Sequence, residues 1–498
     1  MWPFGVKQTK PRKRRRTRDV WKPNSKLLTF SKSASLSLDS AYQNIFICGA
    51  PGSSKTTGSG AAVAEGLLNM GAGGLVLVAK PDEIPRWLKY CRRNGRSRDV
   101  VVLGPNEGFN FINYELERKG SGRGLIENIV DLFSIGCEIA NHSQSQKGSG
   151  REEGQFWANS RKQLCRNAAV LLKLGHGRVG AREVYELVNS APTSLEQKNS
   201  ADWRAHSLCA QCLVEADRRC SAEDRNDLDI AATFFLHEWP THDHKTRANI
   251  ASTLTSMIDV LLRGLANEML CGRTTVTPEC LEAGRVVIMG VPLLEYGLPA
   301  ALIQGIVKFS FQRGLLRRNV AKSPRPVFIF ADEFQCFLNS FDQEFLAMSR
   351  SARVVNVCLT QNIPNLYAAL GGEQRGKSQV DSILGNMNLK IMHANGEPTT
   401  NEWASNCIGH SKQYTFNANS TNPSQGLWPN PMGYGLDPQV SAGMSESYQF
   451  EVQPSEFTRL RPGGRRHGWN ADAIVFQSGH TFADTGKTWR RATFRQKF

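Results

Sequence analysis

The sequence predicts an α/β protein whose mainly parallel β-sheet is interrupted, along the chain, by a long all-helical segment. Short unbroken apolar runs alternate with helical stretches over residues 41–123 and again from residue 286 onward. This alternation is typical of parallel strands that helices cover on both faces. Between residues 124 and 270 no comparable β-rich run occurs, and polar linkers separate helical stretches. We therefore expect one sheet domain built from two parts of the chain, with an inserted all-α domain.

Length and charge limit the class of protein. The 498 residues are enough for several domains, and an apolar content of 40% is enough for buried cores. The formal net charge is +16, which suits a polyanionic partner, either nucleic acid or an anionic membrane surface. Part of this excess lies in residues 7–18, a basic run with the composition of a solvated tail.

We find no membrane or export signal in the sequence. No run of eighteen apolar residues occurs, so no transmembrane helix is expected, and the amino terminus does not have the pattern of a signal peptide. The twelve cysteines are scattered rather than arranged as a disulfide framework, which indicates a reducing compartment. We expect a cytoplasmic protein whose contact with a membrane, if it has one, is peripheral at the inner face.

Four segments are expected along the chain. Residues 1–40 form a basic tail and a Ser/Leu-rich lead-in strand, and residues 41–123 form the first part of the sheet domain. Residues 124–270 form the all-α domain, and residues 271–498 complete the sheet domain with short strands at the end. The predicted strands are residues 45–48, 74–79, 100–103, 286–289, 327–330, 354–360 and 389–393. The predicted helices are residues 58–70, 87–98, 125–139, 155–174, 181–188, 206–218, 245–270, 299–316 and 341–352. The Asn/Pro/Gly/Ser-rich residues 417–443 are interpreted as a surface loop.

The sequence G-A-P-G-S-S-K-T follows the first predicted strand and precedes the first predicted helix. A strand, a short loop of small residues ending in Lys-Thr, and a helix form the context that a phosphate-binding loop requires. Backbone N–H groups of such a loop point into one concavity and favour an anion there. Lys55 adds a charge for the outer phosphates of ATP, and Thr56 offers a hydroxyl to Mg²⁺. The residues expected to bind the nucleotide are Gly49, Ala50, Pro51, Gly52, Ser53, Ser54, Lys55, Thr56 and Thr57.

One position departs from the phosphate-loop pattern. The pattern G-x-x-x-x-G-K-[ST] has glycine where this chain has Ser54. Glycine adopts a positive φ freely, whereas serine has a steric cost there. Either the loop takes a shape that Ser54 tolerates, or nucleotide binding is weakened. A Gly/Ser turn between a strand and a helix is the alternative interpretation of the whole stretch.

Two acidic residues follow the predicted strand 327–330. Asp332 and Glu333 emerge together at its carboxyl end, the edge where ligands bind in open α/β sheets. We expect Asp332 to hold Mg²⁺ through its water shell and Glu333 to act as the base that polarises the attacking water. An acidic turn after a buried strand is the structural alternative.

Further candidates flank the predicted strand 354–360. Gln361 follows its end, where it can hydrogen-bond the γ-phosphate or the attacking water and so sense the nucleotide state. Arg350 precedes the strand, and its planar guanidinium can stabilise transition-state charge in the site of a neighbouring subunit. Arg353 is the rival for that role. A polar strand end and a surface arginine are the structural alternatives.

Other patterns carry less weight. Lys80 and Asp82 follow the second predicted strand, where they support the site or simply form a polar turn. The segment H-E-W-P-T-H, residues 237–242, contains a proline that would break the helix a zinc protease needs. The basic residues 459–467 are interpreted as a charged loop that turns at Pro-Gly-Gly. A zinc site is not expected at an H-x-x-C-x-x-C pattern that falls on a predicted helix, His206, Cys209 and Cys212 with the later Cys220.

In their order and spacing these motifs resemble a RecA-like P-loop ATPase of the FtsK/HerA superfamily, and within it the conjugative coupling proteins (TraG/TraD-like) of type IV secretion. The segment A-K-P-D-E, residues 79–83, is similar to the family's D-P-K-G-E. Phe156 and Trp157 open the α domain, as an aromatic-Trp pair does in relatives. T-N-E-W-A-S precedes I-G, and V-Q-P-S-E-F resembles the family's L-x-P-x-E-h stretch near the carboxyl terminus. The match spans residues 40–498. The departures are Ser54 and the missing transmembrane helices that coupling proteins carry at the amino terminus.

The resemblance implies an ATP-driven DNA translocase that hydrolyses ATP with Mg²⁺. It would move or recruit DNA, single- or double-stranded, through a homo-hexameric ring, with a relaxase or other type IV secretion components as partners. Arg350 would act across the subunit boundary of such a ring. The catalytic set is then Glu333, Lys55, Gln361 and Arg350, with Thr56 and Asp332 at the Mg²⁺.

Two alternatives stay open. The first is a recruitment platform that binds nucleotide with low turnover and presents a relaxase or another protein substrate; Ser54 and the missing membrane anchor favour it. The second is a HerA-like motor that works with a partner nuclease, since no nuclease motif occurs in this chain.

Overall fold

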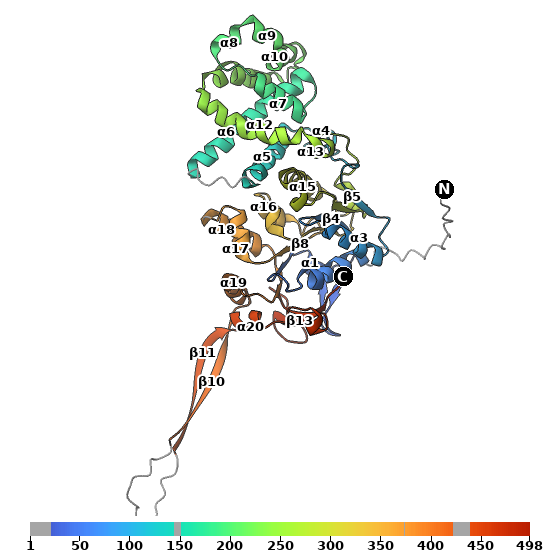
Figure 1. The fold of residues 1–498 in the computed structure, drawn as a ribbon, viewed down its shortest axis with the longest axis vertical. Helices are drawn as coiled ribbons and strands as arrows, with labels where there is room; N and C mark the ends of the chain where they lie inside the picture. The colour runs from blue at the N-terminus through green and yellow to red at the C-terminus, as the bar shows by residue number, and fades with distance from the viewer. Residues whose placement is uncertain (1–20, 144–150, 373, 422–438) are drawn as a thin grey trace, which may run out of the picture.

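A nine-stranded sheet forms the centre of the molecule (Figure 1). The computed structural model describes residues 21–143, 151–372, 374–421 and 439–498, so the basic run 7–18 lies outside the described residues. The strand order is β13-β12-β9-β3-β8-β7-β4-β6-β5. A helical region, residues 124–270, lies at one end of the long axis of the molecule. A two-stranded ribbon, β10 and β11, extends from the other end. The predicted fold class, a parallel α/β sheet with an inserted all-α segment, is confirmed.

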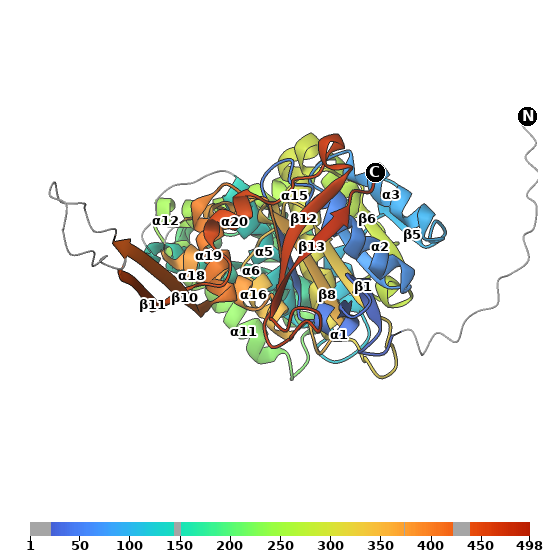
Figure 2. The ribbon, with the colours of Figure 1, turned by 90° about the horizontal axis from the view of Figure 1, so that it is seen from below.

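Neighbouring strands from β9 to β5 in this order are all parallel. Except for β5 at the outer edge, these strands are almost entirely buried and mostly apolar, because helices cover both faces of this part of the sheet. At one edge β12 (Asn470–Gln477) runs antiparallel to β9, and β13 (Trp489–Arg495) runs antiparallel to β12 (Figure 2). The parallel strands are β3 (Ile45–Cys48), β4 (Gly73–Leu77), β5 (Val100–Leu103), β6 (Val286–Met289), β7 (Val327–Ala331), β8 (Val354–Thr360) and β9 (Leu389–His393).

The carboxyl ends of the central strands meet at one edge of the sheet. In the register Cys48 of β3 lies beside Thr360 of β8, and Ala331 of β7 lies beside Leu77 of β4. The segments that follow these four strands therefore leave the sheet next to one another. These segments contain the phosphate loop, the two acidic residues, Gln361 and Lys80.

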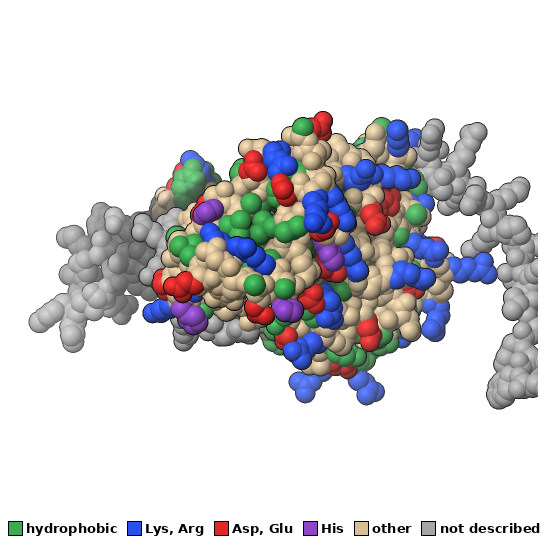
Figure 3. All heavy atoms as spheres, turned by 90° about the horizontal axis from the view of Figure 1, so that it is seen from above, with side chains coloured by type: hydrophobic (Ala, Val, Ile, Leu, Met, Phe, Trp, Pro, Cys, Tyr) green, Lys and Arg blue, Asp and Glu red, His purple; other side chains and the backbone are tan. Residues whose placement is uncertain are grey.

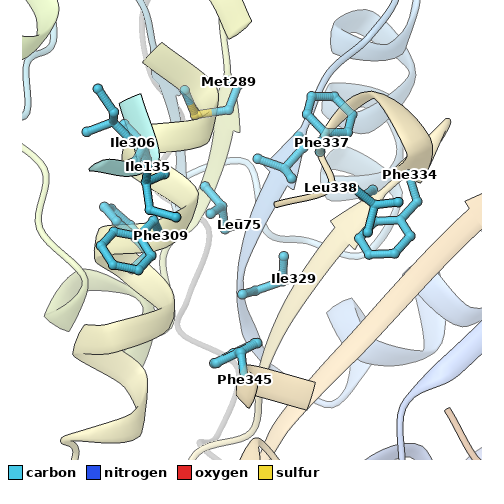
Figure 4. Close-up of a cluster of buried hydrophobic side chains, with 14 of the residues drawn as sticks. Leu75, Ile135, Met289, Ile306, Phe309, Ile329, Phe334, Phe337, Leu338 and Phe345 are labelled. Atoms are coloured by element: carbon cyan, nitrogen blue, oxygen red, sulfur yellow. The ribbon is translucent and has the colours of Figure 1, made fainter. Parts of the chain in front are cut away.

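Helix α15 (Leu293–Leu316) lies between the sheet and the helical region. Figure 4 shows Leu75 and Ile329 of the sheet near Ile306 and Phe309 of α15 and Ile135 of α5. The helix starts before the predicted residue 299 because a first turn precedes a kink at Gly297, where φ is 54°. The remaining helices outside the helical region are α1 (Leu38–Ala41), α2 (Ala61–Asn69), α3 (Glu83–Arg93), α4 (Phe111–Glu117), α14 (Glu279–Glu282), α16 (Asp342–Met348), α17 (Ile363–Ala369), α18 (Gln374–Gly385), α19 (Pro398–Ile408) and α20 (Pro454–Thr458).

Between residues 124 and 270 every described regular element is helical. The predicted helix 245–270 is in fact two helices, because Arg263 has an extended backbone (φ −118°, ψ 144°). The exact limits of the inserted domain stay a prediction. None of the described helices is both long and apolar enough to cross a membrane. The helices of this region are α5 (Ile126–Ser143), α6 (Arg151–Leu171), α7 (Ala181–Ser190), α8 (Leu195–Asn199), α9 (Ala201–His206), α10 (Leu208–Arg219), α11 (Arg225–Thr233), α12 (His244–Leu261) and α13 (Gly264–Leu270).

Two predictions outside the sheet need correction. The interpretation of residues 417–443 as a loop is wrong at both ends, since β10 (His410–Thr421) and β11 (Gln439–Phe450) pair there as an antiparallel ribbon. The Asn, Pro, Gly and Ser content of the segment favoured a loop over the strands at its two ends. The predicted lead-in strand is in fact two short strands, β1 (Lys26–Thr29) and β2 (Ser35–Ser37), which pair with each other apart from the central sheet. Residues 422–438 lie outside the described residues.

Candidate nucleotide site

The predicted phosphate loop connects β3 to a π-helical turn, η1 (Thr56–Gly60), which continues into α2. Lys55 is only 7% exposed, so its charge is held close to the loop. The hydroxyl of Ser53 is buried and has no hydrogen-bond partner among the described residues. A buried donor without a partner fits a loop that receives a phosphate oxygen. The sequence-predicted residues 49–57 thus lie where the pattern places them, at the carboxyl edge of the sheet.

Ser54 adopts the backbone conformation that the pattern reserves for glycine. Its φ is 65°, and its hydroxyl donates a hydrogen bond to the carbonyl oxygen of Pro462, over 2.5 Å. The loop therefore takes a shape that Ser54 tolerates, and the tolerance comes from a contact with the carboxyl-terminal part of the chain. Nothing in the local sequence indicates this contact, since the two residues are 408 positions apart.

Two residues near the carboxyl terminus also form hydrogen bonds with Thr57. The side chain of Gln496 donates to the Thr57 hydroxyl over 3.1 Å, and the backbone N–H of Lys497 donates to the Thr57 carbonyl over 2.8 Å. The same Gln496 accepts from the backbone N–H of Gly464 over 2.6 Å. The turn after Pro462 and the end of β13 thus hold the outer side of the phosphate loop.

Thr56 and Asp332 are in direct contact. The Thr56 hydroxyl donates to Oδ2 of Asp332 over 2.7 Å, and the Asp332 residue is 6% exposed. Hydroxyl and carboxylate oxygens are the ligands that Mg²⁺ takes beside phosphate groups in sites of this kind. These two oxygens fit a Mg²⁺ ion, and the two residues predicted for it are brought together.

Glu333 is the most constrained residue of the site. It has a left-handed backbone (φ 55°, ψ 51°) and is 5% exposed. Its carboxylate accepts from Lys80 Nζ over 2.7 Å and from Gln335 Nε2 over 2.9 Å. Burial alone would raise the pKa of Glu333, but the hydrogen bonds from Lys80 and Gln335 and the charges of Lys55 and Lys80 lower it to about 2. The carboxylate is therefore ionised, as a residue that accepts a proton from water must be.

Gln361 joins this group, as predicted. Its Nε2 lies 3.2 and 3.3 Å from the two carboxylate oxygens of Glu333. Gln335 was not predicted; it bridges Glu333 to the hydroxyl of Thr360, which donates to Gln335 Oε1 over 2.8 Å. The polar side chain two positions after Glu333 was the only sequence signal for it.

A histidine behind the phosphate loop was also not predicted. His393 ends β9 and is fully buried, and its Nε2 lies 2.6 Å from the hydroxyl of Ser59 in η1. Burial and the nearby charge of Lys55 lower the pKa of His393 to about 3, so that the ring is neutral. His393 thus braces the start of the helix. A histidine at the end of the strand beside β3 was a signal that could have been used.

Arg350 does not reach the site of its own chain. It precedes β8, at the amino end of the strand, whereas the phosphate loop lies at the carboxyl ends. Its guanidinium lies 3.3 Å from Asp39, and its side chain is 58% exposed. Arg353 turns at the same end with φ 49° and donates to the carbonyl of Pro324 over 3.3 Å. Both arginines therefore lie at the opposite end of strand β8 from the site that contains Glu333.

Among the described residues no group of histidine, cysteine and acidic side chains could hold another metal ion. Cys209 and Cys212 are buried on α10, and burial raises the pKa of both thiols.

Glu83 lies beside the site and supports Lys80. Burial and the nearby charge of Asp332 raise the pKa of Glu83 to about 8. Its carboxyl group accepts a hydrogen bond from the backbone N–H of Lys80 over 3.0 Å. Glu83 thereby fixes the backbone from which Lys80 reaches Glu333.

The chain is similar to known proteins in part of its sequence and in its fold. Residues 326–460 match a family model described as the TraM recognition site of TraD and TraG. The unbound form of the bacterial conjugative coupling protein TrwBdeltaN70 has a TM-score of 0.56 at 14% identity, and the alignment covers 97% of this chain and 91% of that chain. TrwB with the non-hydrolysable ATP analogue ADPNP also has a TM-score of 0.56 at 14% identity, covering 97% and 92%. TrwB with ADP and Mg²⁺ has a TM-score of 0.55 at 14% identity, covering 96% and 91%.

No curated protein sequence matches the chain. The family match includes β7, Asp332, Glu333 and β8, and ends within the charged loop before β12. The structural likeness extends over nearly the whole chain. The resemblance to conjugative coupling proteins of the TraG/TraD type is thus confirmed, by the family match of residues 326–460 and by the fold of the whole chain.

Proposed function

We propose that this chain is a Mg²⁺-dependent ATPase that moves or recruits DNA through a ring of six copies. The observation that carries the proposal is the hydrogen bond from Thr56 to Asp332, over 2.7 Å. It brings the end of the phosphate loop and the first acidic residue after β7 into one oxygen-rich site, next to the ionised Glu333. TrwB, which has the same fold, is known in complexes with an ATP analogue and with ADP and Mg²⁺.

Each residue of the site has a defined role in this reaction. Lys55 and the backbone N–H groups of the loop bind the outer phosphates. Thr56 and Asp332 hold the Mg²⁺, which would neutralise phosphate charge when bound. Glu333 orients the attacking water and takes its proton. Gln361, which contacts Glu333, is placed to turn toward the γ-phosphate and report its presence.

The place of Arg350 supports an assembly of several copies. An exposed arginine at the edge of the sheet opposite to its own site has no part in that site, but it is available to a neighbouring copy. In a closed ring the same two surfaces meet at every boundary. Arg350 of one copy then stabilises the transition-state charge in the next.

The charge of the chain supports a nucleic-acid partner. The excess of sixteen positive charges suits a phosphate backbone. On the face formed by the helical end, Lys and Arg side chains lie among acidic side chains and do not form one continuous patch (Figure 3). The strandedness of the DNA therefore does not follow from this face.

A recruitment platform with low turnover is the second candidate. One observation favours it: residues 326–460 match a family described by a protein-recognition site. Ser54, which suggested low turnover from the sequence, is tolerated by the loop. Under this function a relaxase or another type IV secretion component binds the chain whether or not ATP is hydrolysed.

The two functions differ in how ATP hydrolysis responds to DNA and to substitution. For a motor, DNA stimulates the ATPase rate of the full chain, and Glu333→Gln abolishes turnover while ATP still binds. For a platform, DNA leaves the rate unchanged, and a captured protein partner stays bound to both Lys55→Ala and Glu333→Gln proteins. A rate that is high, DNA-stimulated and indifferent to Glu333→Gln would contradict both.

A further inference from the structure

The carboxylate of Glu333 is contacted by three protein side chains. Oε1 accepts from Lys80 over 2.7 Å and lies 3.2 Å from Gln361, while Oε2 accepts from Gln335 over 2.9 Å and lies 3.3 Å from Gln361. An ionised carboxyl group offers about four lone-pair sites. The nitrogens of Lys80, Gln335 and Gln361 therefore take about three of these sites, so that Glu333 is engaged mainly by the chain itself.

Lys80 makes the strongest of these contacts. It is the only charged donor to Glu333 among the described residues, and a charge-assisted hydrogen bond is about twice as strong as a neutral one. The contact follows from the sheet register, because Leu77 lies beside Ala331 and each strand releases its next segment at the same edge. Glu83 fixes the Lys80 backbone, so the ammonium group reaches Glu333 from a set position.

Stability alone does not account for this ion pair. The Lys80 side chain is 45% exposed, whereas that of Glu333 is 7% exposed. A half-exposed lysine contributes little to folding, because water screens the charge and the long side chain loses entropy. The exposed stem also leaves Lys80 free to swing away, while Glu333 is held by the backbone on either side.

We infer that Lys80 is a positioning residue that restrains Glu333 in an idle arrangement and must release it before water can be activated. The inference rests on the proposed ATPase function, in which Glu333 takes the proton from water. Breaking the contact then consumes free energy at some point before hydrolysis. Removing the ammonium group removes that barrier, so the restraint predicts an enzyme that is faster without Lys80.

The test compares steady-state ATP hydrolysis by the full chain carrying Lys80→Met, which keeps the stem and removes the charge. We expect kcat/KM to rise about fivefold, the equivalent of a contact worth about 1 kcal/mol. If the contact opens when ATP binds, KM falls; if it opens later, kcat rises. Lys80→Arg retains the pair and stays within about twofold of the parent. Lys89→Met on α3, an exposed lysine, is the matched control and leaves the rate unchanged.

A merely structural role would lower kcat and the melting temperature together in Lys80→Met. A kcat/KM that is unchanged or lower in Lys80→Met overturns the inference. Combining Lys80→Met with Glu333→Gln separates this failure from failure of the proposed function. Loss of hydrolysis in the double variant keeps Glu333 as the base, whereas full hydrolysis in Glu333→Gln alone shows that the proposed function itself is wrong.

Discussion

The hydroxyl of Ser54 in the phosphate loop donates a hydrogen bond to the carbonyl oxygen of Pro462, over 2.5 Å. Ser54 has φ 65°, a conformation that costs a residue with a side chain about 1 kcal/mol. A neutral hydrogen bond contributes about the same amount. The departure from glycine at this position is thus offset by a contact with a distant turn, and the loop keeps its shape.

Substitution of Ser54 should separate the cost of its backbone conformation from the contribution of its hydrogen bond. Ser54→Ala keeps the unfavourable φ and loses the hydrogen bond, so we expect a loss of about 1 kcal/mol in unfolding free energy and weaker ATP binding. Ser54→Gly loses the bond but also the strain, so its stability should stay within about 0.5 kcal/mol of the parent. Thermal denaturation measures the change in stability, and titration with a fluorescent ATP analogue measures the change in ATP binding. Equal effects of the two substitutions would show that the φ of Ser54 does not matter.

Gly463, next to Pro462, should tolerate no side chain. Its φ is +93°, and an added Cβ would lie 2.5 Å from the Ser54 hydroxyl. Gly463→Ala should therefore push the turn away from the phosphate loop and weaken ATP binding, while Gly486→Ala, with positive φ but open space around it, affects only stability. Equal ATP affinity in the two variants would show that the turn does not contribute to ATP binding.

Asp472 anchors this turn and should make it sensitive to acid. Its carboxylate accepts two hydrogen bonds from Arg461, over 2.7 and 2.8 Å, and one from Arg491. Burial alone would raise the pKa of Asp472, but these bonds and one from Thr493 lower it below the ordinary range. A lowered pKa contributes stability above the unfolded value of about 3.9 and loses it as the pH falls further.

The melting temperature of the parent should therefore decrease as the pH is lowered below about 4. Asp472→Asn should lose about 2 kcal/mol at pH 7 and show a smaller further decrease in acid. Glu456→Gln removes a carboxylate whose 3.4 Å pair with Arg459 is exposed, so it is the control and should change stability by less than about 0.5 kcal/mol. Parallel acid profiles of parent and Asp472→Asn would exclude this role.

Arg350 should act only between copies. Arg350→Ala is expected to lower kcat about 10³-fold and leave ATP affinity unchanged, as for an arginine supplied to a phosphoryl-transfer site. Asp39→Asn removes the 3.3 Å partner of Arg350 within the chain and should not lower kcat. Mixing Arg350→Ala with Glu333→Gln protein should restore hydrolysis, since each copy supplies what the other lacks. No restoration in a mixture that forms rings would place Arg350 outside catalysis.

Local sequence patterns were sufficient for the centre of this site. The carboxyl ends of parallel strands lie at one edge of a sheet, so Asp332, Glu333 and Gln361, which each follow a predicted strand, could be placed at the same edge as the phosphate loop. Apolar runs such as residues 286–289 and 354–360 marked buried strands at their observed limits. Arg350, at the other end of its strand, could likewise be assigned away from its own site.

Contacts between distant segments could not be predicted in the same way. Pro462 meets Ser54 only because β12 and β13 join the sheet beside β9, and neither pairing has a sequence signature at the loop. The strands of the ribbon β10–β11 do carry apolar residues at every second position, at 414–418 and 440–444, but the Asn, Pro and Gly content between them favoured a loop. Lys80 could be placed at the end of a strand, but its contact with Glu333 depends on the register of β4 with β7, which the sequence does not give.

The proposed reaction is hydrolysis of ATP at the edge formed by the phosphate loop and β7. Its most direct measurement is the rate of phosphate release by the full chain with ATP, Mg²⁺ and DNA, compared with Lys55→Ala and Glu333→Gln proteins of equal melting temperature. We predict that both substitutions lower the rate at least about 100-fold, that chelation of Mg²⁺ does the same, and that Glu333→Gln still binds ATP. A Lys55→Ala protein as active as the parent would contradict the account.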